Sequence, residues 1–311
     1  MHNPSRRAAS VVAYLVCMLV IPVALTLNSV TTPATVIQNS DNPTPSGYTI
    51  SLSLFLFPMA SLFFWMWRFK KLSFQKTAFW YSLALLAPTG IVLDILFGNA
   101  FFVFENHNAV SGVYFPALGG PLPIEEIIFY ISGFTTVLLL YVWCDEYWFE
   151  RYNVPDYTVE SAKIDKVLQI HWASLAIGFG LVLLATAYKK LISNSSDGFP
   201  WYFTYIAIVA LIPSMAFYKS AKPFINWRAF SFTFFIIVLI SLIWESTLAL
   251  PYQWWGFQER AMTGIFIGAW HDLPLEEIVV WFSVSYASII IYETIKIWLA
   301  SRKTLKQLFF G

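Results

Sequence analysis

Long apolar runs separated by short polar segments occupy the chain from end to end. A helix needs about 20 mostly apolar residues to cross the hydrocarbon core of a membrane, and the sequence offers about eight such runs. They lie near Ala8–Leu27, Tyr48–Trp67, Thr77–Phe104, Leu122–Trp143, Leu168–Tyr188, Trp201–Tyr218, Ala229–Leu248 and Leu273–Ile295. The pattern predicts an all-α integral membrane protein of about eight transmembrane helices.

The first apolar run follows Arg6 and Arg7, as the core of a signal peptide would. Its length and the lack of a small-residue cleavage site favour a membrane span instead. With the N-terminus inside, eight spans place all but three of the 19 basic residues in inner segments, the exceptions being Lys189, Lys190 and Arg260. The positive-inside rule then predicts a protein of the cell inner membrane with both termini in the cytoplasm.

The two halves of the chain are related in sequence. A shift of 151 positions places residues 122–127 (LPIEEI) on residues 273–278 (LPLEEI), which are identical at five of six positions. The same shift places Asp94 on Glu245, and Tyr141 on Tyr292. Such matches across whole helices indicate an internal duplication.

The duplication predicts two tandem halves of four spans each. We assign residues 1–143 to the first repeat, residues 144–167 to a polar inner linker, and residues 168–311 to the second repeat. Because each half has an even number of spans, the copies have the same orientation, as in parallel membrane repeats. Both acidic motifs are therefore expected on the same, outer side.

Composition narrows the function further. Hydrophobic residues make up 58% of the chain and charged residues only 12%, too few to solvate a soluble protein of this size. The net charge of +1 lacks the basic excess that nucleic-acid binding requires. Aromatic residues reach 19%, more than interfacial belts need, so the excess either faces lipid or lines a cavity for a large apolar or cationic species.

The Pro-x-Glu-Glu motif has two readings. Proline in a first helical turn, with acidic residues at the positive end of the helix dipole, is ordinary helix-start chemistry. Asp94 and Glu245, however, lie within apolar runs, where ionisable side chains normally face a cavity or a partner. Burial and neighbouring like charge favour a protonated carboxyl, so such a group can serve as an acid with an ionised neighbour as base.

Consecutive residues on a helix point about 100° apart, so both members of a Glu-Glu pair cannot face one small site. The sequence leaves open which member faces inward. Of the four histidines, His107 and His271 lie in outer loops ahead of the acidic pairs, and both a solvated loop position and a place in the site fit them. Neither a metal site nor a dinucleotide or Walker motif is visible, and Cys17 and Cys144 are expected to be packing residues.

These residues together resemble the membrane lycopene cyclase domain, in the single-chain form of the two-subunit-type carotenoid cyclases. The hallmark of that family is Pro-x-Glu-Glu at a helix start, preceded by an acidic helix and a loop with aromatics and glycine. The first copy carries Asp94, Gly112, Pro123, Glu125, Glu126 and Phe129. The second copy carries Trp244, Glu245, Gly264, Pro274, Glu276, Glu277 and Phe282.

The resemblance implies a non-redox cyclisation of the acyclic end of lycopene to a β-ring. It implies acid/base roles for four carboxyls, Glu125, Glu126, Glu276 and Glu277, with Asp94 and Glu245 orienting them or sharing protons. It implies substrate contacts by Phe129, Tyr130, Trp244 and Trp281. The partners would be membrane lipid, a long apolar polyene and other carotenoid enzymes. No cofactor is evident from sequence, and recruitment of a reduced flavin and the oligomeric state are left open.

Two alternatives compete with cyclisation. A carotenoid end-group hydratase would end the same cation with water, which changes the product mass. A proton-coupled membrane transporter would use the paired carboxyls as proton carriers and leave carotenoids unaltered. A prenyltransferase is the least favoured, because no aspartate-rich pair for magnesium and diphosphate is present.

Overall fold

The computed structural model describes residues 44–68, 74–154 and 157–310. Seven helical segments in this part of the chain are long and apolar enough to cross a membrane. They are Gly47–Arg68, Lys76–Phe101, Ile124–Trp148, Trp172–Leu191, Trp201–Ala221, Trp227–Ala249 and Glu276–Ser301. Each coincides with a predicted span, so these seven predictions are confirmed. The remaining one, near Ala8–Leu27 and containing Cys17, lies outside the described residues.

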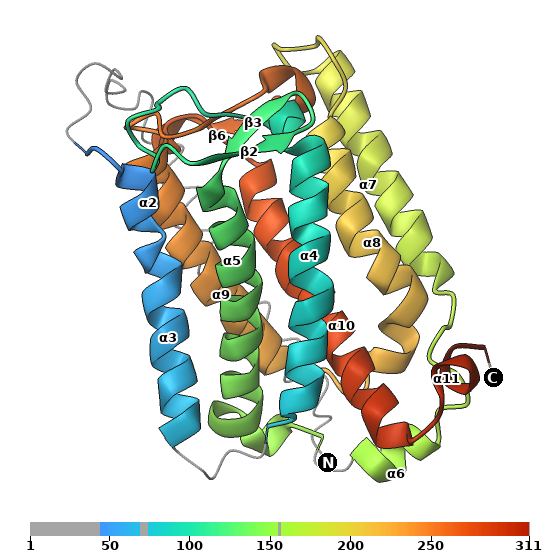
Figure 1. Cartoon of the computed structure of the whole chain (residues 1–311). Coiled ribbons are helices and arrows are strands. Elements are labelled where there is room, and N and C mark those ends of the chain that lie inside the picture. The colour runs from blue at the N-terminus through green and yellow to red at the C-terminus, as the bar shows by residue number, and fades with distance from the viewer. Residues whose placement is uncertain (1–43, 69–73, 155–156, 311) are drawn as a thin grey trace.

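The spanning segments form one bundle (Figure 1). Their helices are α2 (Gly47–Ser51), α3 (Ser53–Arg68), α4 (Lys76–Phe101), α5 (Ile124–Trp143), α7 (Trp172–Leu191), α8 (Trp201–Ala221), α9 (Trp227–Trp244) and α10 (Glu276–Ser301). π-Helical turns extend α5 over Cys144–Trp148 and α9 over Glu245–Ala249. Short helices α6 (Tyr157–Ala162) and α11 (Leu305–Phe310) lie at the end of the bundle opposite the acidic motifs.

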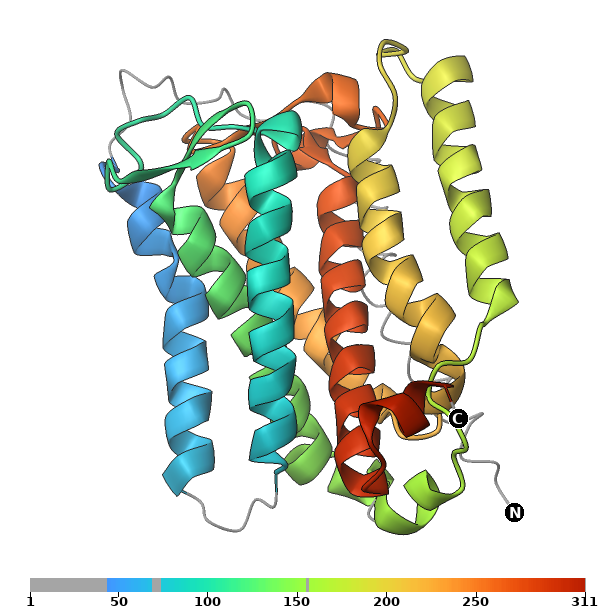
Figure 2. The ribbon, with the colours of Figure 1, turned by 45° about the vertical axis from the view of Figure 1, so that its right-hand side comes forward.

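The repeat seen in the sequence recurs in the arrangement of the helices. The shift of 151 positions relates α3 to α8, α4 to α9 and α5 to α10. α5 and α10 are the most buried of the spanning helices and pack against each other. α7 stands at the edge of the bundle and packs against α8 (Figure 2). The interface between the two halves is therefore built mainly on the helices that begin with the acidic motifs.

Short strands cover the end of the bundle that carries the acidic motifs, a feature that the hydropathy pattern did not predict. β2 (Tyr114–Ala117) pairs with β3 (Gly120–Pro123), and β5 (Phe266–Ile267) pairs with β6 (Leu273–Pro274), each as an antiparallel hairpin that leads into α5 or α10. A third pair joins the two halves, because β1 (Phe102–Val103) pairs antiparallel with β4 (Gly256–Phe257). The strands fix the motif-bearing ends of α5 and α10 relative to each other.

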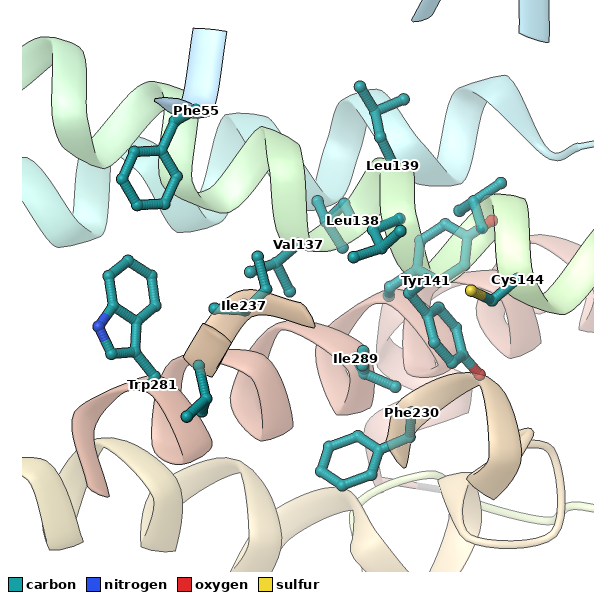
Figure 3. Packing of buried hydrophobic residues seen from close by; sticks show 14 of the residues in the cluster. Phe55, Val137, Leu138, Leu139, Tyr141, Cys144, Phe230, Ile237, Trp281 and Ile289 are labelled. Atoms are coloured by element: carbon teal, nitrogen blue, oxygen red, sulfur yellow. The ribbon is translucent and has the colours of Figure 1, made fainter. Parts of the chain in front are cut away.

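The core between the halves is filled by aromatic and branched side chains (Figure 3). Phe55 of α3 and Trp281 of α10 lie with parallel rings, their centroids 5.7 Å apart. Val137 and Leu138 of α5 pack with Ile289 of α10 deeper in the bundle. Interiors packed this closely hold side chains in fixed rotamers, so the core sets the geometry of the polar groups beside it.

A buried ion cluster lies at the end of the core away from the acidic motifs. Lys296 Nζ is 3.5 Å from Asp145 Oδ2 and 3.3 Å from Glu293 Oε1. The Tyr141 hydroxyl donates to Glu293 Oε1 at 2.8 Å. Buried charges are tolerated when they are paired and hydrogen-bonded. Because Asp145 follows α5 and Lys296 belongs to α10, the cluster joins the two halves.

Candidate active site

A cavity of about 90 Å³ lies between the two halves, just below the strands that cap the bundle. Three carboxyl side chains, Glu126, Glu245 and Glu277, line it. The remaining wall is largely aromatic and includes Tyr48, Phe102, Phe104, Phe129, Tyr130, Phe134, Tyr202, Trp244, Trp255 and Trp281. Carboxyl groups from both repeats thus converge on one apolar chamber, which we call the central cavity.

The structure decides which glutamate of each pair faces this cavity. Glu126 and Glu277, the second members, line it, whereas Glu125 and Glu276 do not. Consecutive residues on a helix point about 100° apart, so only one glutamate of each pair can face the cavity. In both repeats the second glutamate lines the cavity, so the internal symmetry includes the orientation of these side chains.

Glu125 and Glu276 instead hold the loops ahead of their helices. Glu125 Oε1 accepts the Ser111 backbone N–H at 2.7 Å and also the Thr49 hydroxyl. Glu276 Oε1 accepts the Thr263 backbone N–H at 2.5 Å. These contacts tie the first glutamates to the loops, whereas the sequence did not distinguish the surroundings of the two members of each pair.

Each of these loops turns at a glycine with positive φ. Gly112 follows Ser111 and has φ 83°, and Gly264 follows Thr263 and has φ 87°. A residue without a Cβ adopts this left-handed conformation at little cost. The glycines noted in both copies of the motif therefore allow the backbone to present its N–H to the first glutamate.

Two tyrosines contact the cavity-facing glutamates, and sequence reasoning missed both. The Tyr48 hydroxyl, at the start of α2, donates to Glu126 Oε1. The Tyr202 hydroxyl, at the start of α8, interacts with the Glu277 carboxyl. Both tyrosines are buried. Their signal in the sequence was only a tyrosine at the motif-side end of a span, which is also typical of an interfacial belt.

Glu245 forms a polar cluster with Glu277. Its Oε1 accepts the Ser241 hydroxyl at 2.9 Å and the Trp281 indole N–H at 3.3 Å, and its carboxyl interacts with that of Glu277. Glu245 also begins the π-helical turn at the end of α9. π-Helical turns are frequent at functional sites, where they redirect a side chain.

Asp94, the counterpart of Glu245, lies in a different setting. It is buried on α4, and the Tyr130 hydroxyl donates to its Oδ1 at 3.4 Å. Asp94 lines a second cavity rather than the central one, while Tyr130 lines both. The sequence paired Asp94 with Glu245 by position, and the structure shows that their surroundings differ.

The four aromatic residues expected to contact substrate all line the central cavity. The Phe129 ring centroid is 5.3 Å from that of Trp244 and 5.7 Å from that of Trp281. Tyr130 lies next to Phe129, with ring centroids 5.8 Å apart. Aromatic faces attract cations, so these rings can stabilise positive charge that develops inside the cavity.

The second cavity is an apolar groove of about 500 Å³ between α4 and α8, with α10 lining it from behind. It is lined by Leu85, Leu93, Asp94, Phe97, Phe101, Tyr202, Tyr205, Ile208, Ile212, Phe217, Ala287 and Ile291, among others. Phe102, Tyr130, Phe134, Tyr202, Val280 and Val284 line both cavities. The α4–α8 groove therefore adjoins the central cavity, and these six side chains lie between the two spaces.

The outer-loop histidines lie away from this site. His107 Nδ1 is 3.0 Å from the Tyr114 hydroxyl in an exposed position, and His271 occupies the turn before β6 with φ 54°. Neither lines either of the two cavities. In the described ranges, no group of three or more His, Cys, Asp and Glu side chains has the arrangement to hold a metal ion.

Comparisons with known proteins point to one family. A family model described as lycopene cyclase matches residues 46–144 and 199–295, which together make up more than half of the chain. Each matched segment contains one acidic helix and one Pro-x-Glu-Glu motif. Neither the comparison with curated proteins nor that with solved structures gives a match.

Proposed function

Because the chain belongs to the lycopene cyclase family, a family of carotenoid cyclisation, we propose that it closes the acyclic end of lycopene to a β-ring in the central cavity. The observation that carries the proposal is the convergence of Glu126, Glu245 and Glu277 on one aromatic chamber. The α4–α8 groove supplies an apolar path from that chamber toward lipid. Carboxyl groups and cation-stabilising aromatic faces thus meet in one chamber beside an apolar groove.

The reaction is balanced in protons and electrons. A carboxyl proton adds to the less substituted carbon of the terminal double bond and leaves a tertiary cation. The neighbouring double bond attacks this cation, which forms the bond that closes a six-membered ring and a second tertiary cation. A carboxylate removes a proton from the ring carbon that bears the chain, and the ring double bond forms. One proton enters and one leaves, so the product has the mass of the substrate.

The Glu245–Glu277 pair supports the acid role. An ionised carboxylate only accepts hydrogen bonds, so two interacting carboxyls are stabilised when they share a proton. Two adjacent negative charges in an apolar chamber are also costly. We assign proton donation to this pair, with Glu277 as the member next to Tyr202.

Glu126 supports the base role. It accepts the Tyr48 hydroxyl, which holds the carboxyl at the cavity wall, and it stands on the opposite repeat from the acid. Trp244, Trp281 and Phe129 lie on the cavity wall, and their faces stabilise the cations between the two proton transfers. A proton passed back from Glu126 to the acidic pair would reset the site.

The orientation in the membrane follows from charge. Basic residues gather at the end of the bundle opposite the motifs, at Arg68, Lys76, Lys219, Lys222, Arg302 and Lys303. The motif end holds Lys189, Lys190 and Arg260. The positive-inside rule then places the C-terminus in the cytoplasm and the acidic motifs toward the outer face of the cell inner membrane. A reporter active only in the cytoplasm, fused after Gly311, should be active, and an inactive fusion in a stable protein would reverse the orientation.

The experiment that tests the function is expression in cells that accumulate lycopene, followed by pigment analysis. We expect a ring-containing product of unchanged mass, which is lost in a Glu126→Gln, Glu277→Gln double variant. Glu105→Gln is the matched control, because Glu105 is an exposed carboxyl at the same end of the bundle. A product heavier by one water would favour the hydratase. Unaltered lycopene from a well-expressed protein would contradict cyclisation of this substrate and favour a proton-coupled transporter.

A further inference from the structure

The internal duplication predicts two equivalent paths into the central cavity. The α4–α8 groove has α10 as its floor, and the shift of 151 positions converts these helices into α9, α3 and α5. A symmetric protein would therefore have a second groove between α9 and α3, over α5. The residue that corresponds to Leu93 of the α4–α8 groove is Trp244.

On the α4–α8 side, the part of the chain that the structure describes leaves the groove open at the surface of the bundle. Phe97 of α4 is 40% exposed, and Ile212 of α8 is 59% exposed, although both line the groove. α10 packs against both helices and is seen between them in Figure 2. The lining extends along α4 from Leu85 to Phe101, which is about 24 Å at the helical rise per residue. A rigid, extended polyene needs a path of this length and apolar character.

On the α9–α3 side, the corresponding space is filled. Trp244 is only 2% exposed, and its indole N–H donates to the Ser51 hydroxyl at 2.7 Å. Its ring centroid is 5.2 Å from that of Phe55, which is fully buried and stacks on Trp281. Figure 3 shows Phe55 and Trp281 facing each other across this part of the core. A tryptophan and a phenylalanine thus occupy the path that a leucine leaves open on the other side.

We propose that the polyene substrate occupies the α4–α8 groove alone, with Trp244 closing the equivalent path between α9 and α3. This inference rests on the proposed cyclase function. A substrate held this way presents one end to Glu126 and Glu277 while its other end extends toward lipid. The enzyme then forms one ring per binding event, and a substrate with two acyclic ends has to leave and return reversed to receive the second ring. The duplicated fold thus admits substrate through only one of its two symmetry-related sides.

The test introduces a tryptophan into the α4–α8 groove at the position that corresponds to Trp244. Leu93→Trp places on α4 the residue that closes the other path, and Val92→Trp is the matched control, because Val92 is the adjacent residue, is 53% exposed and lines neither of the two cavities. Lycopene retained by protein purified into lipid nanodiscs is measured in the Glu126→Gln, Glu277→Gln background, and conversion is measured in the active background. We expect Leu93→Trp to lower retention and conversion at least tenfold relative to Val92→Trp.

Equal retention and conversion in the two variants would overturn the groove assignment. If Leu93→Trp does not fold, Ile212→Trp blocks the same groove from an exposed position on α8 and takes its place. The first product released from excess lycopene should carry one ring, and a two-ring product without a one-ring precursor would overturn the one-end inference. A wild-type protein that retains lycopene but leaves it unaltered would instead contradict the cyclase function while supporting the groove.

Discussion

The hydroxyl of Tyr48 donates a hydrogen bond to the carboxyl of Glu126, although the two residues are 78 positions apart in the chain. The contact joins the start of α2 to the start of α5 at the wall of the central cavity. It fixes the position of the carboxyl to which we assign proton removal.

Replacing Tyr48 with Phe should therefore slow cyclisation. The ring and its packing remain, whereas the hydrogen bond that positions Glu126 is lost, and we expect a rate lower by roughly tenfold to a hundredfold. Tyr114→Phe is the control, because the Tyr114 hydroxyl contacts only the exposed His107 among the hydrogen bonds described. Product formation per amount of folded protein is the measurement. Equal rates for the two variants would remove Tyr48 from the mechanism.

The two members of the second acidic pair should separate chemistry from stability. Glu277→Gln removes the proposed proton donor and should lower the rate by roughly 100-fold or more, with a small effect on thermal unfolding. Glu276→Gln keeps an oxygen to accept the Thr263 N–H and should retain most activity. Glu276→Ala leaves that buried N–H without an acceptor and should cost about 1–3 kcal/mol of stability. Rates and unfolding temperatures measured in detergent check both effects, and an inactive, stable Glu276→Gln protein would contradict the division of roles.

The two loop glycines provide a matched pair for backbone strain. Gly112 and Gly264 have nearly equal positive φ angles, 83° and 87°, so alanine at either position should cost about 1–2 kcal/mol. A Cβ on Gly112 would meet nothing within 4 Å, whereas on Gly264 it would lie 2.1 Å from Ser193 Oγ and 3.0 Å from Ser193 Cβ. Gly264→Ala should therefore be the more destabilising change, and adding Ser193→Gly should bring it near the level of Gly112→Ala. Thermal unfolding of the variants decides whether the contact with Ser193 matters.

The ion cluster between the halves predicts a stability effect remote from the site. Lys296→Met leaves the buried Asp145 and Glu293 carboxyls without the cation between them and should destabilise the protein by about 3–5 kcal/mol. Lys222→Met, at an exposed position near the same end of the bundle, should have little effect. Thermal unfolding is the measurement. An unchanged unfolding temperature for Lys296→Met would show that the cluster does not brace the halves.

The sequence alone determined the membrane-spanning architecture and the location of the acidic motifs. A bilayer imposes apolar runs of about 20 residues on any spanning helix, and this signal survives without knowledge of the packing. The internal duplication is also visible in the sequence, because LPIEEI at residues 122–127 and LPLEEI at residues 273–278 can be matched by position alone. The aromatic residues Phe129 and Trp281 could be associated with the site because they follow these motifs closely.

Only the tertiary structure decided how the two copies divide the work. Contacts between segments far apart in the chain determine that Glu126, and not Glu125, faces the cavity. They also bring Tyr48 and Tyr202 to the glutamates and form the strand pair that joins the halves. Corresponding positions of the two repeats also differ, because Trp244 is buried against Phe55, whereas Leu93 lines the α4–α8 groove. Sequence periodicity records which face of a helix is apolar, whereas packing between helices determines which apolar space is filled and which can receive a substrate.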